Sequence, residues 1–202
     1  MQVSKPSINL VWLKRDLRTQ DHAPLKMAEE QELPYIVLFC FEPDFLDYPD
    51  TSLRHLMFQY HSLKHLSKIL EPFNIPVCMW YVSVEKALEA LLQQFDIQHI
   101  FSYQESGIMA TYKRDQAIQS YCIKHGMVWN EYQRDGILRG IKNREGWDKQ
   151  WYAVMHAPII QNTYRKQAVL NLEVNFPLPE SLESTLLDYP VAFQPAGEHY
   201  AW

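Results

Sequence analysis

Short hydrophobic runs alternate with longer amphipathic stretches along most of the chain. Continuous apolar runs of four to eight residues predict buried strands, whereas apolar residues three and four positions apart predict helices. Gly126 is expected to end the helix predicted over 107–125. We therefore expect strands over 8–13, 35–41, 75–82, 99–103 and from 127, and helices over 24–31, 51–70, 83–95 and 107–125.

This order of elements predicts an α/β fold. We expect a Rossmann-like, doubly wound domain with a five-stranded, mostly parallel sheet and helices on both faces. The domain should span residues 1–132. Residues 133–170 are expected to form a basic and aromatic helical extension that packs on this domain or on its partner, and residues 171–202 an acidic interdomain linker.

The composition narrows the class of protein. The chain has 202 residues, of which 47% are hydrophobic and 21% charged, as in a globular domain. Its net charge of -5 argues against strong binding of a nucleic-acid backbone by this chain alone. Three widely spaced cysteines and the absence of paired histidine ligands indicate no disulfide framework and no metal site, which suits a cytoplasmic protein. No apolar run is long enough to cross a membrane.

Glycine usage excludes two common nucleotide motifs. The sequence holds neither G-x-G-x-x-G nor G-x-x-x-x-G-K-[ST], and it has only six glycines. An unrelated nucleotide-binding α/β enzyme remains an alternative, but these missing motifs count against it. Any ligand should be held by side chains and by loops at the strand ends.

The first stretch with candidate chemistry follows the first strand. Residues 12–22 carry Arg15, Asp16, Arg18, Asp21 and His22 within a single turn. Loops at the carboxyl ends of parallel strands are where open α/β sheets bind ligands. Alternatively, these charges pair locally and brace the first helix.

The second stretch follows the fourth strand and contains Glu105, with Arg114 and Asp115 on the next helix. A carboxylate at a strand end can accept hydrogen bonds from the N–H groups of a heterocycle. The competing interpretations are that Glu105 stabilises the N-terminus of the following helix, and that Arg114 and Asp115 form an ion pair that ties this helix to the sheet.

Taken together, these motifs resemble the N-terminal antenna domain of the DNA photolyase and cryptochrome family. The family pattern W-x-x-R-D-L-R-x-x-D-[NH] matches residues 12–22, and its fourth-strand glutamate and later Arg-Asp pair match residues 105 and 114–115. Residues 133–155 look like one bacterial branch. Residues 194–201 look like the start of the helical FAD-binding domain, whose cofactor residues are absent from this chain.

The resemblance implies an antenna site and a role in repair. The chromophore would be a reduced folate, a deazaflavin or a flavin, and FAD would be held by the C-terminal helical domain, the partner of this one. The full-length protein would be a deoxyribodipyrimidine photolyase, which repairs pyrimidine dimers in damaged DNA by light-driven electron transfer from FAD. This chain alone would have no catalytic residue. The implied chromophore-binding residues are Lys14, Arg15, Asp16, Phe41, Glu42, Gln104 and Glu105.

Three alternatives stay open on the sequence. The parent protein could be a cryptochrome-type blue-light photoreceptor that shares the fold. The domain could bind no antenna and serve as a structural partner of the flavin domain. The basic and aromatic residues of 133–155 could contact nucleic acid through phosphates and stacking, although packing on a partner domain is the favoured interpretation.

Overall fold

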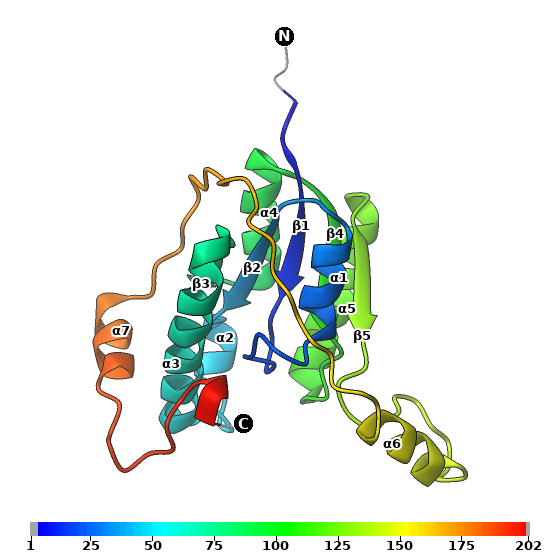
Figure 1. Ribbon diagram of the computed structural model, residues 1–202. Helices are drawn as coiled ribbons and strands as arrows, with labels where there is room; N and C mark the ends of the chain where they lie inside the picture. The colour runs from blue at the N-terminus through cyan, green and yellow to red at the C-terminus, as the bar shows by residue number, and fades with distance from the viewer. Residues whose placement is uncertain (1–3, 201–202) are drawn as a thin grey trace.

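The computed structural model describes residues 4–200; residues 1–3 and 201–202, at the outer ends of the predicted α/β domain and acidic tail, lie outside the described residues. It contains a five-stranded sheet in the order β3-β2-β1-β4-β5 (Figure 1). All four strand pairings are parallel. The predicted fold class is therefore confirmed. The strands are β1 (Ser7–Trp12), β2 (Tyr35–Cys40), β3 (Val77–Trp80), β4 (Asp96–Tyr103) and β5 (Val128–Tyr132).

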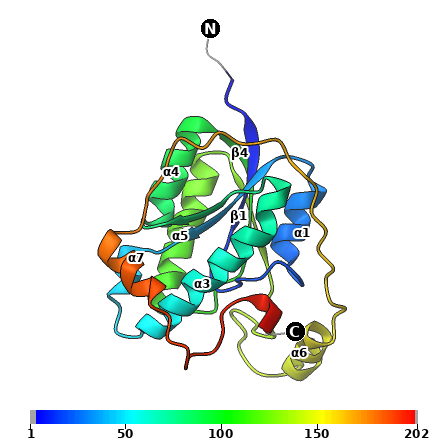
Figure 2. The ribbon, with the colours of Figure 1, turned by 60° about the vertical axis from the view of Figure 1, so that its left-hand side comes forward.

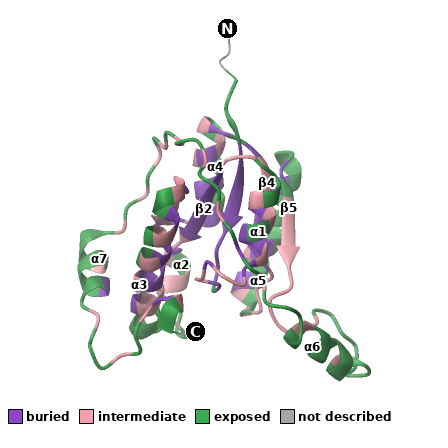
Figure 3. Cartoon of the chain, viewed as in Figure 1, coloured by how far each residue is buried: buried purple, intermediate pink, exposed green. Residues whose placement is uncertain are grey.

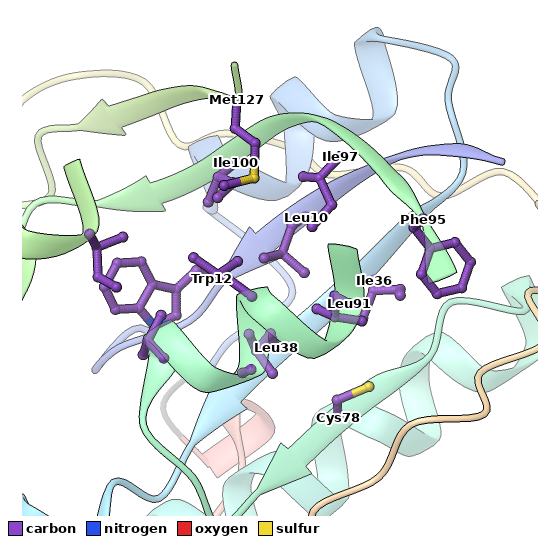
Figure 4. Packing of buried hydrophobic residues seen from close by; sticks show 14 of the residues in the cluster. Leu10, Trp12, Ile36, Leu38, Cys78, Leu91, Phe95, Ile97, Ile100 and Met127 are labelled. Atoms are coloured by element: carbon purple, nitrogen blue, oxygen red, sulfur yellow. The ribbon is translucent and has the colours of Figure 1, made fainter. Parts of the chain in front are cut away.

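Helices cover both faces of the sheet because the central strands are apolar on both sides. In β1, Leu10 and Trp12 pack on one face, beneath α4 (Val84–Gln94) and α5 (Met109–Lys124). Val11 packs on the other face, beneath α1 (Ala23–Glu30) and α3 (Leu53–Leu70). Figure 4 shows the first of these cores, and the burial colours of Figure 3 show the buried strands between the two layers.

The strand order creates a switch point between β1 and β4. The chain leaves β1 toward β2 and β3 on one side, and returns to β4 and β5 on the other. The loops that follow β1 and β4 therefore diverge at the carboxyl edge of the sheet, where doubly wound folds bind their ligands. This edge lies at the lower end of the strands in Figure 1.

Two helices lie where the sequence predicted only loop or linker. The first, α2 (Pro43–Leu46), directly follows β2, and the second, α7 (Glu180–Leu187), lies within the acidic tail. A proline at or next to each N-terminus favours helix initiation. Leu186 of α7 is then fully buried against the core on the α3 side. Helix α2 is too short to repeat an apolar pattern, and α7 lies in an acidic segment whose prolines indicate a linker.

The N-termini of α3 and α4 are not capped by the side chains of their N-cap residues. Ser52 and Ser83 occupy the N-cap positions of α3 and α4, but neither side chain makes a capping hydrogen bond. The first N–H of α4, that of Val84, instead donates to the carboxylate of Glu42. The predicted helix end is confirmed, since Gly126 follows the C-cap residue of α5 with a φ of 73°.

The chain after β5 first leaves the domain and then returns to it. Helix α6 (Trp147–Met155) has no buried residue and stands away from the sheet in Figures 1 and 3. The following segment runs back across the domain, where the Gln167 side chain bonds to both backbone groups of Tyr35. Helix α7 then lies beside α3, and the short 3-10 helix η2 (Glu198–Tyr200) reaches the carboxyl edge of the sheet (Figure 2).

Replacement of Leu186 tests whether α7 stabilises the domain. We expect Leu186→Ala to lower the free energy of unfolding by about 2 to 4 kcal/mol, because it deletes a fully buried side chain. Urea unfolding monitored by circular dichroism measures this change. The neighbouring Leu187 is 54% exposed, so Leu187→Ala should change the unfolding free energy by less than about 0.5 kcal/mol. Equal effects of the two substitutions would contradict the packing of α7 on α3.

Candidate functional site

A cavity of about 840 Å³ opens at the carboxyl edge of the sheet, at the switch point. Its walls come mainly from the loops after β1, β2 and β4 and from α3, and α5 and the C-terminal segment also contribute to them. The structure brings together six of the seven predicted site residues, namely Lys14, Arg15, Asp16, Phe41, Glu42 and Glu105. Gln104 does not line the cavity, and its backbone N–H donates to the carbonyl of Tyr132, which extends the pairing of β4 with β5.

Asp16 shapes the turn that follows β1. One carboxylate oxygen accepts from the backbone N–H groups of Lys14 and Arg15, each at 3.1 Å. The other oxygen lies 2.7 Å from Nε2 of His22, and both side chains are almost fully buried. Burial alone would raise the pKa of Asp16, but the hydrogen bonds from His22 and from the backbone outweigh it and lower the pKa below its usual value.

The same histidine caps helix α1. Nδ1 of His22 accepts from the N–H of Leu25 at 3.2 Å, so Nε2 must carry the proton that faces Asp16. Asn162 completes this cap, since its amide bonds to both backbone groups of His22. Asp16 thus holds the turn from the inside, and Asn162, in the segment that returns across the domain after α6, holds it from the outside.

Lys14 is directed into a buried ion pair. Its Nζ lies 2.9 Å from Asp115 on α5 and 3.5 Å from Glu131 on β5. The ammonium also lies 4.4 Å from the ring centroid of Trp12 and 5.0 Å from that of Trp129. Because its side chain is only 3% exposed, Lys14 ties β1 to α5 and β5.

Arg114 shares Asp115 with Lys14 and extends this group of ion pairs to Glu42. Its guanidinium lies 2.8 Å from Glu42 and 2.8 Å from Asp115. Burial raises the pKa of Glu42 above its usual value, although Arg114 opposes this shift. The contacts support the interpretation that Arg114 and Asp115 tie α5 to the sheet, and they also place Arg114 in the cavity wall.

Glu105 is a buried carboxylate of the cavity wall, and one of its oxygens lacks a hydrogen-bond partner among the described residues. Its side chain is only 5% exposed, and Nε of Arg15 lies 3.0 Å from its Oε1. This contact is an ion pair without hydrogen-bond geometry, so Oε1 has no hydrogen-bond partner among the described residues. Arg15 offsets the charge of this buried oxygen, but no protein donor replaces the hydrogen bonds it would make to water, which favours a ligand that donates to it. Arg15 itself is half-exposed.

One wall of the cavity was not predicted from the sequence. His55, Gln59 and Ser62 of α3 line it, whereas the apolar stripe of this helix indicates only its core-facing side. Glu198 also reaches the cavity, where its carboxylate accepts from the N–H and hydroxyl of Thr19. No local pattern predicts a contact between residues separated by nearly the whole chain.

Two other kinds of site are absent from the part of the chain that the structure describes. Within residues 4–200, no three His, Cys, Asp or Glu side chains are grouped so that they could hold a metal ion. In the same range, no helix is both long enough and apolar enough to cross a membrane.

Replacement of Asp16 tests its role in building the turn. We expect Asp16→Asn to lower the free energy of unfolding at pH 7 by about 2 to 4 kcal/mol, because an amide cannot accept from both the backbone and Nε2 of His22. Because the folded state lowers the pKa of Asp16, its ionisation stabilises the protein above about pH 4, and this contribution is lost as the pH falls below that value.

Urea unfolding at pH 7 and at about pH 3 measures both effects. The difference between wild type and Asp16→Asn should shrink at the lower pH. Asp47 is exposed, so Asp47→Asn serves as the control and should have little effect at either pH. A difference that grows on acidification would contradict the assigned hydrogen bonds.

Comparison with known proteins found a matching family model and a similar protein of known activity. The family model for DNA photolyase matches residues 9–144, which is about two thirds of the chain. The deoxyribodipyrimidine photo-lyase of Buchnera aphidicola subsp. Acyrthosiphon pisum (strain APS) is 24% identical to this chain over 215 residues. That alignment covers 96% of this chain and 43% of the relative, so the chain spans less than half of the relative's length.

Solved structures show the same fold. A cryptochrome of Synechocystis sp. PCC6803 matches with a TM-score of 0.75 and 18% identity, covering 98% of this chain and 45% of the other. The archaeal photolyase of Sulfolobus tokodaii, solved with two FAD molecules, matches with a TM-score of 0.68 and 17% identity, covering 95% and 44%. Because the family model matches about two thirds of the sequence, the chain belongs to the DNA photolyase family.

Proposed function

We propose that this chain is the light-harvesting domain of a deoxyribodipyrimidine photolyase and that its cavity holds the antenna chromophore. The observation that carries the proposal is the buried Glu105 carboxylate, whose Oε1 lacks a hydrogen-bond partner among residues 4–200 while lining a cavity of about 840 Å³. A cavity of this size suits a conjugated heterocycle. The heterocycle would donate an N–H to Oε1, which satisfies the acceptor.

The residues of the cavity divide into two roles under this proposal. Glu105 and Arg15 would contact the chromophore, since one is unsatisfied and the other half-exposed. Lys14, Asp16 and Glu42 would position those two residues, because their charged atoms are already bonded to protein groups. Phe41 is buried in the core and would supply part of the apolar wall.

The chromophore, when bound, would absorb light and pass excitation energy to FAD. FAD would be held by a C-terminal helical domain to which residues 171–202 lead, and the complete protein would repair pyrimidine dimers in damaged DNA. The Buchnera relative is a deoxyribodipyrimidine photo-lyase and more than twice as long as this chain, which supports this interpretation. The Sulfolobus tokodaii photolyase contains two FAD molecules, with the implication of a novel light-harvesting cofactor, which supports including flavins among the candidate chromophores.

Titration of the purified chain tests the proposal. We expect saturable binding of at least one compound among a reduced folate, a deazaflavin, FMN and FAD, measured by absorbance and fluorescence. Glu105→Gln should weaken the tightest of these complexes about tenfold or more, because a neutral amide is a weaker acceptor than a carboxylate.

The control is Glu145→Gln, a change of the same chemistry at an exposed position outside the cavity. Its dissociation constants should equal those of the wild type. Circular dichroism checks that both variants remain folded. If none of the four compounds binds to the folded wild-type chain, the antenna proposal fails, and the domain is instead a structural partner of the flavin domain.

A further inference from the structure

Three hydrogen-bond donors of the turn after β1 converge on one carboxylate. The Glu198 carboxylate accepts from the backbone N–H and the hydroxyl of Thr19, and from the backbone N–H of Gln20 at 3.2 Å. Consecutive backbone N–H groups that point to one centre form a nest, a common way for proteins to bind anions. Thr19 and Glu198 are separated by nearly the whole chain. The turn therefore binds an anion, and a distant part of the same chain supplies it.

Other contacts hold the donors of this nest in place. The Arg18 side chain donates to the carbonyl of Asp21 at 2.7 Å. Asp21 exchanges hydrogen bonds with the backbone of Ile160, and the hydroxyl of Tyr164 donates to the carbonyl of Thr19. None of these contacts involves the bound carboxylate. If the carboxylate were removed, we expect the donors to stay directed at the same point, with no protein acceptor left for them.

The same turn also carries positive charge. Arg18 is paired with Asp21, but Arg15 contacts Glu105 only through Nε. Both Nη groups of this half-exposed side chain are therefore open to an anion. Arg15, Arg18 and Glu198 line the same cavity. An oxyanion that replaced the carboxylate would be bound by a turn that carries two arginines.

The tail end, residues 194–200, depends on this carboxylate for its attachment. Among residues 4–200, the only hydrogen bonds between the tail end and the chain before residue 171 are those of Glu198. Gly197 has a φ of 112°, and a β-carbon there would lie 3.1 Å from the ring of His65 on α3. His199 packs on the same ring, with centroids 4.4 Å apart, but is itself exposed. The tail end is thus held by one polar contact and one close approach of a glycine.

We propose that the turn at Thr19 and Gln20 is an oxyanion-binding site with Glu198 as its intramolecular ligand, and that phosphate or another oxyanion displaces Glu198 and releases the tail end. Because Gly197 and Glu198 form part of the cavity wall, an oxyanion at this site also opens that wall. The proposal goes beyond the antenna function and does not depend on it, since no chromophore takes part.

Replacement of Glu198 empties the site. We expect Glu198→Ala to bind inorganic phosphate at least about tenfold tighter than the wild type, in which phosphate must displace a carboxylate held close by the chain. Two-dimensional NMR of the ¹⁵N-labelled chain measures binding and locates it. In the variant, the amide signals of Thr19 and Gln20 should shift saturably with phosphate and much less with chloride at the same ionic strength. A contact that only ties the tail to the turn would leave these amides to water, with no such response.

The control is Glu173→Ala, which removes the same charge from an exposed position of the acidic tail. Its affinity for phosphate should equal that of the wild type, which separates the loss of Glu198 from the change in net charge. The amide spectra also show whether each variant is folded. If Thr19 and Gln20 in folded Glu198→Ala do not respond to phosphate up to about 50 mM, the proposal is overturned.

A second variant weakens the contact and keeps the carboxylate. In Gly197→Ala, the β-carbon meets His65 and the φ of 112° becomes strained, so the tail end should be displaced. We expect its affinity for phosphate to lie between those of the wild type and Glu198→Ala. An affinity equal to that of the wild type would contradict the intramolecular competition.

Hydrogen exchange of residues 194–200 tests the release step. Exchange of these amides should be faster in both variants without phosphate than in the wild type. In the wild type it should rise at phosphate concentrations that shift the signals of Thr19 and Gln20, and chloride should not reproduce this rise. Phosphate binding to the wild-type turn with unchanged exchange of the tail end would refute the displacement of Glu198.

Discussion

The organisation of this edge of the domain depends on neutralising charges that the fold buries. Lys14 and Arg114 are brought under the loops by the end of β1 and by α5, where an isolated charge would cost several kcal/mol. Asp115 contacts both of them and thereby links the two halves of the network. Since the partners come from β1, the β2 loop and α5, the network fixes the relative positions of the loops that form the cavity. Removal of Arg114 would leave the buried Glu42 without a cationic partner among the described residues.

This constraint explains why adjacent residues of one motif differ in role. Arg15 and Asp16 are neighbours in the turn after β1, yet Asp16 is buried against His22 and the backbone, whereas Arg15 is half-exposed beside Glu105. On the sequence alone, these charges could either bind a ligand or brace the first helix. The structure shows bracing for Asp16 and, for Arg18 and Asp21, a local pair. Only Arg15 remains available to a ligand.

The fold could be predicted from the sequence because its strands are buried on both faces and appear as continuous apolar runs, such as 35–41. The cavity could be predicted in part, since loops at the carboxyl ends of β1, β2 and β4 must meet at one edge. Ser62 could not be predicted, because its position within α3 resembles any small residue in a helical stripe. Gln104 was expected at the site from the family resemblance, but its backbone N–H bonds to Tyr132 beside β5, and of these two neighbours only Glu105 reaches the cavity.

The returning tail adds a constraint that local patterns do not reveal. Asn162 bonds to both backbone groups of His22, and Glu198 accepts from the backbone of Thr19 and Gln20. Both contacts act on the same turn that carries Arg15 and Asp16. The tail therefore completes the outer side of the turn whose inner side Asp16 holds. Glu198, which lies in the predicted linker 171–202, and Asn162, which lies before it, thus contribute directly to the geometry of the cavity, and a change in how this part of the chain lies would be transmitted to the cavity through the turn.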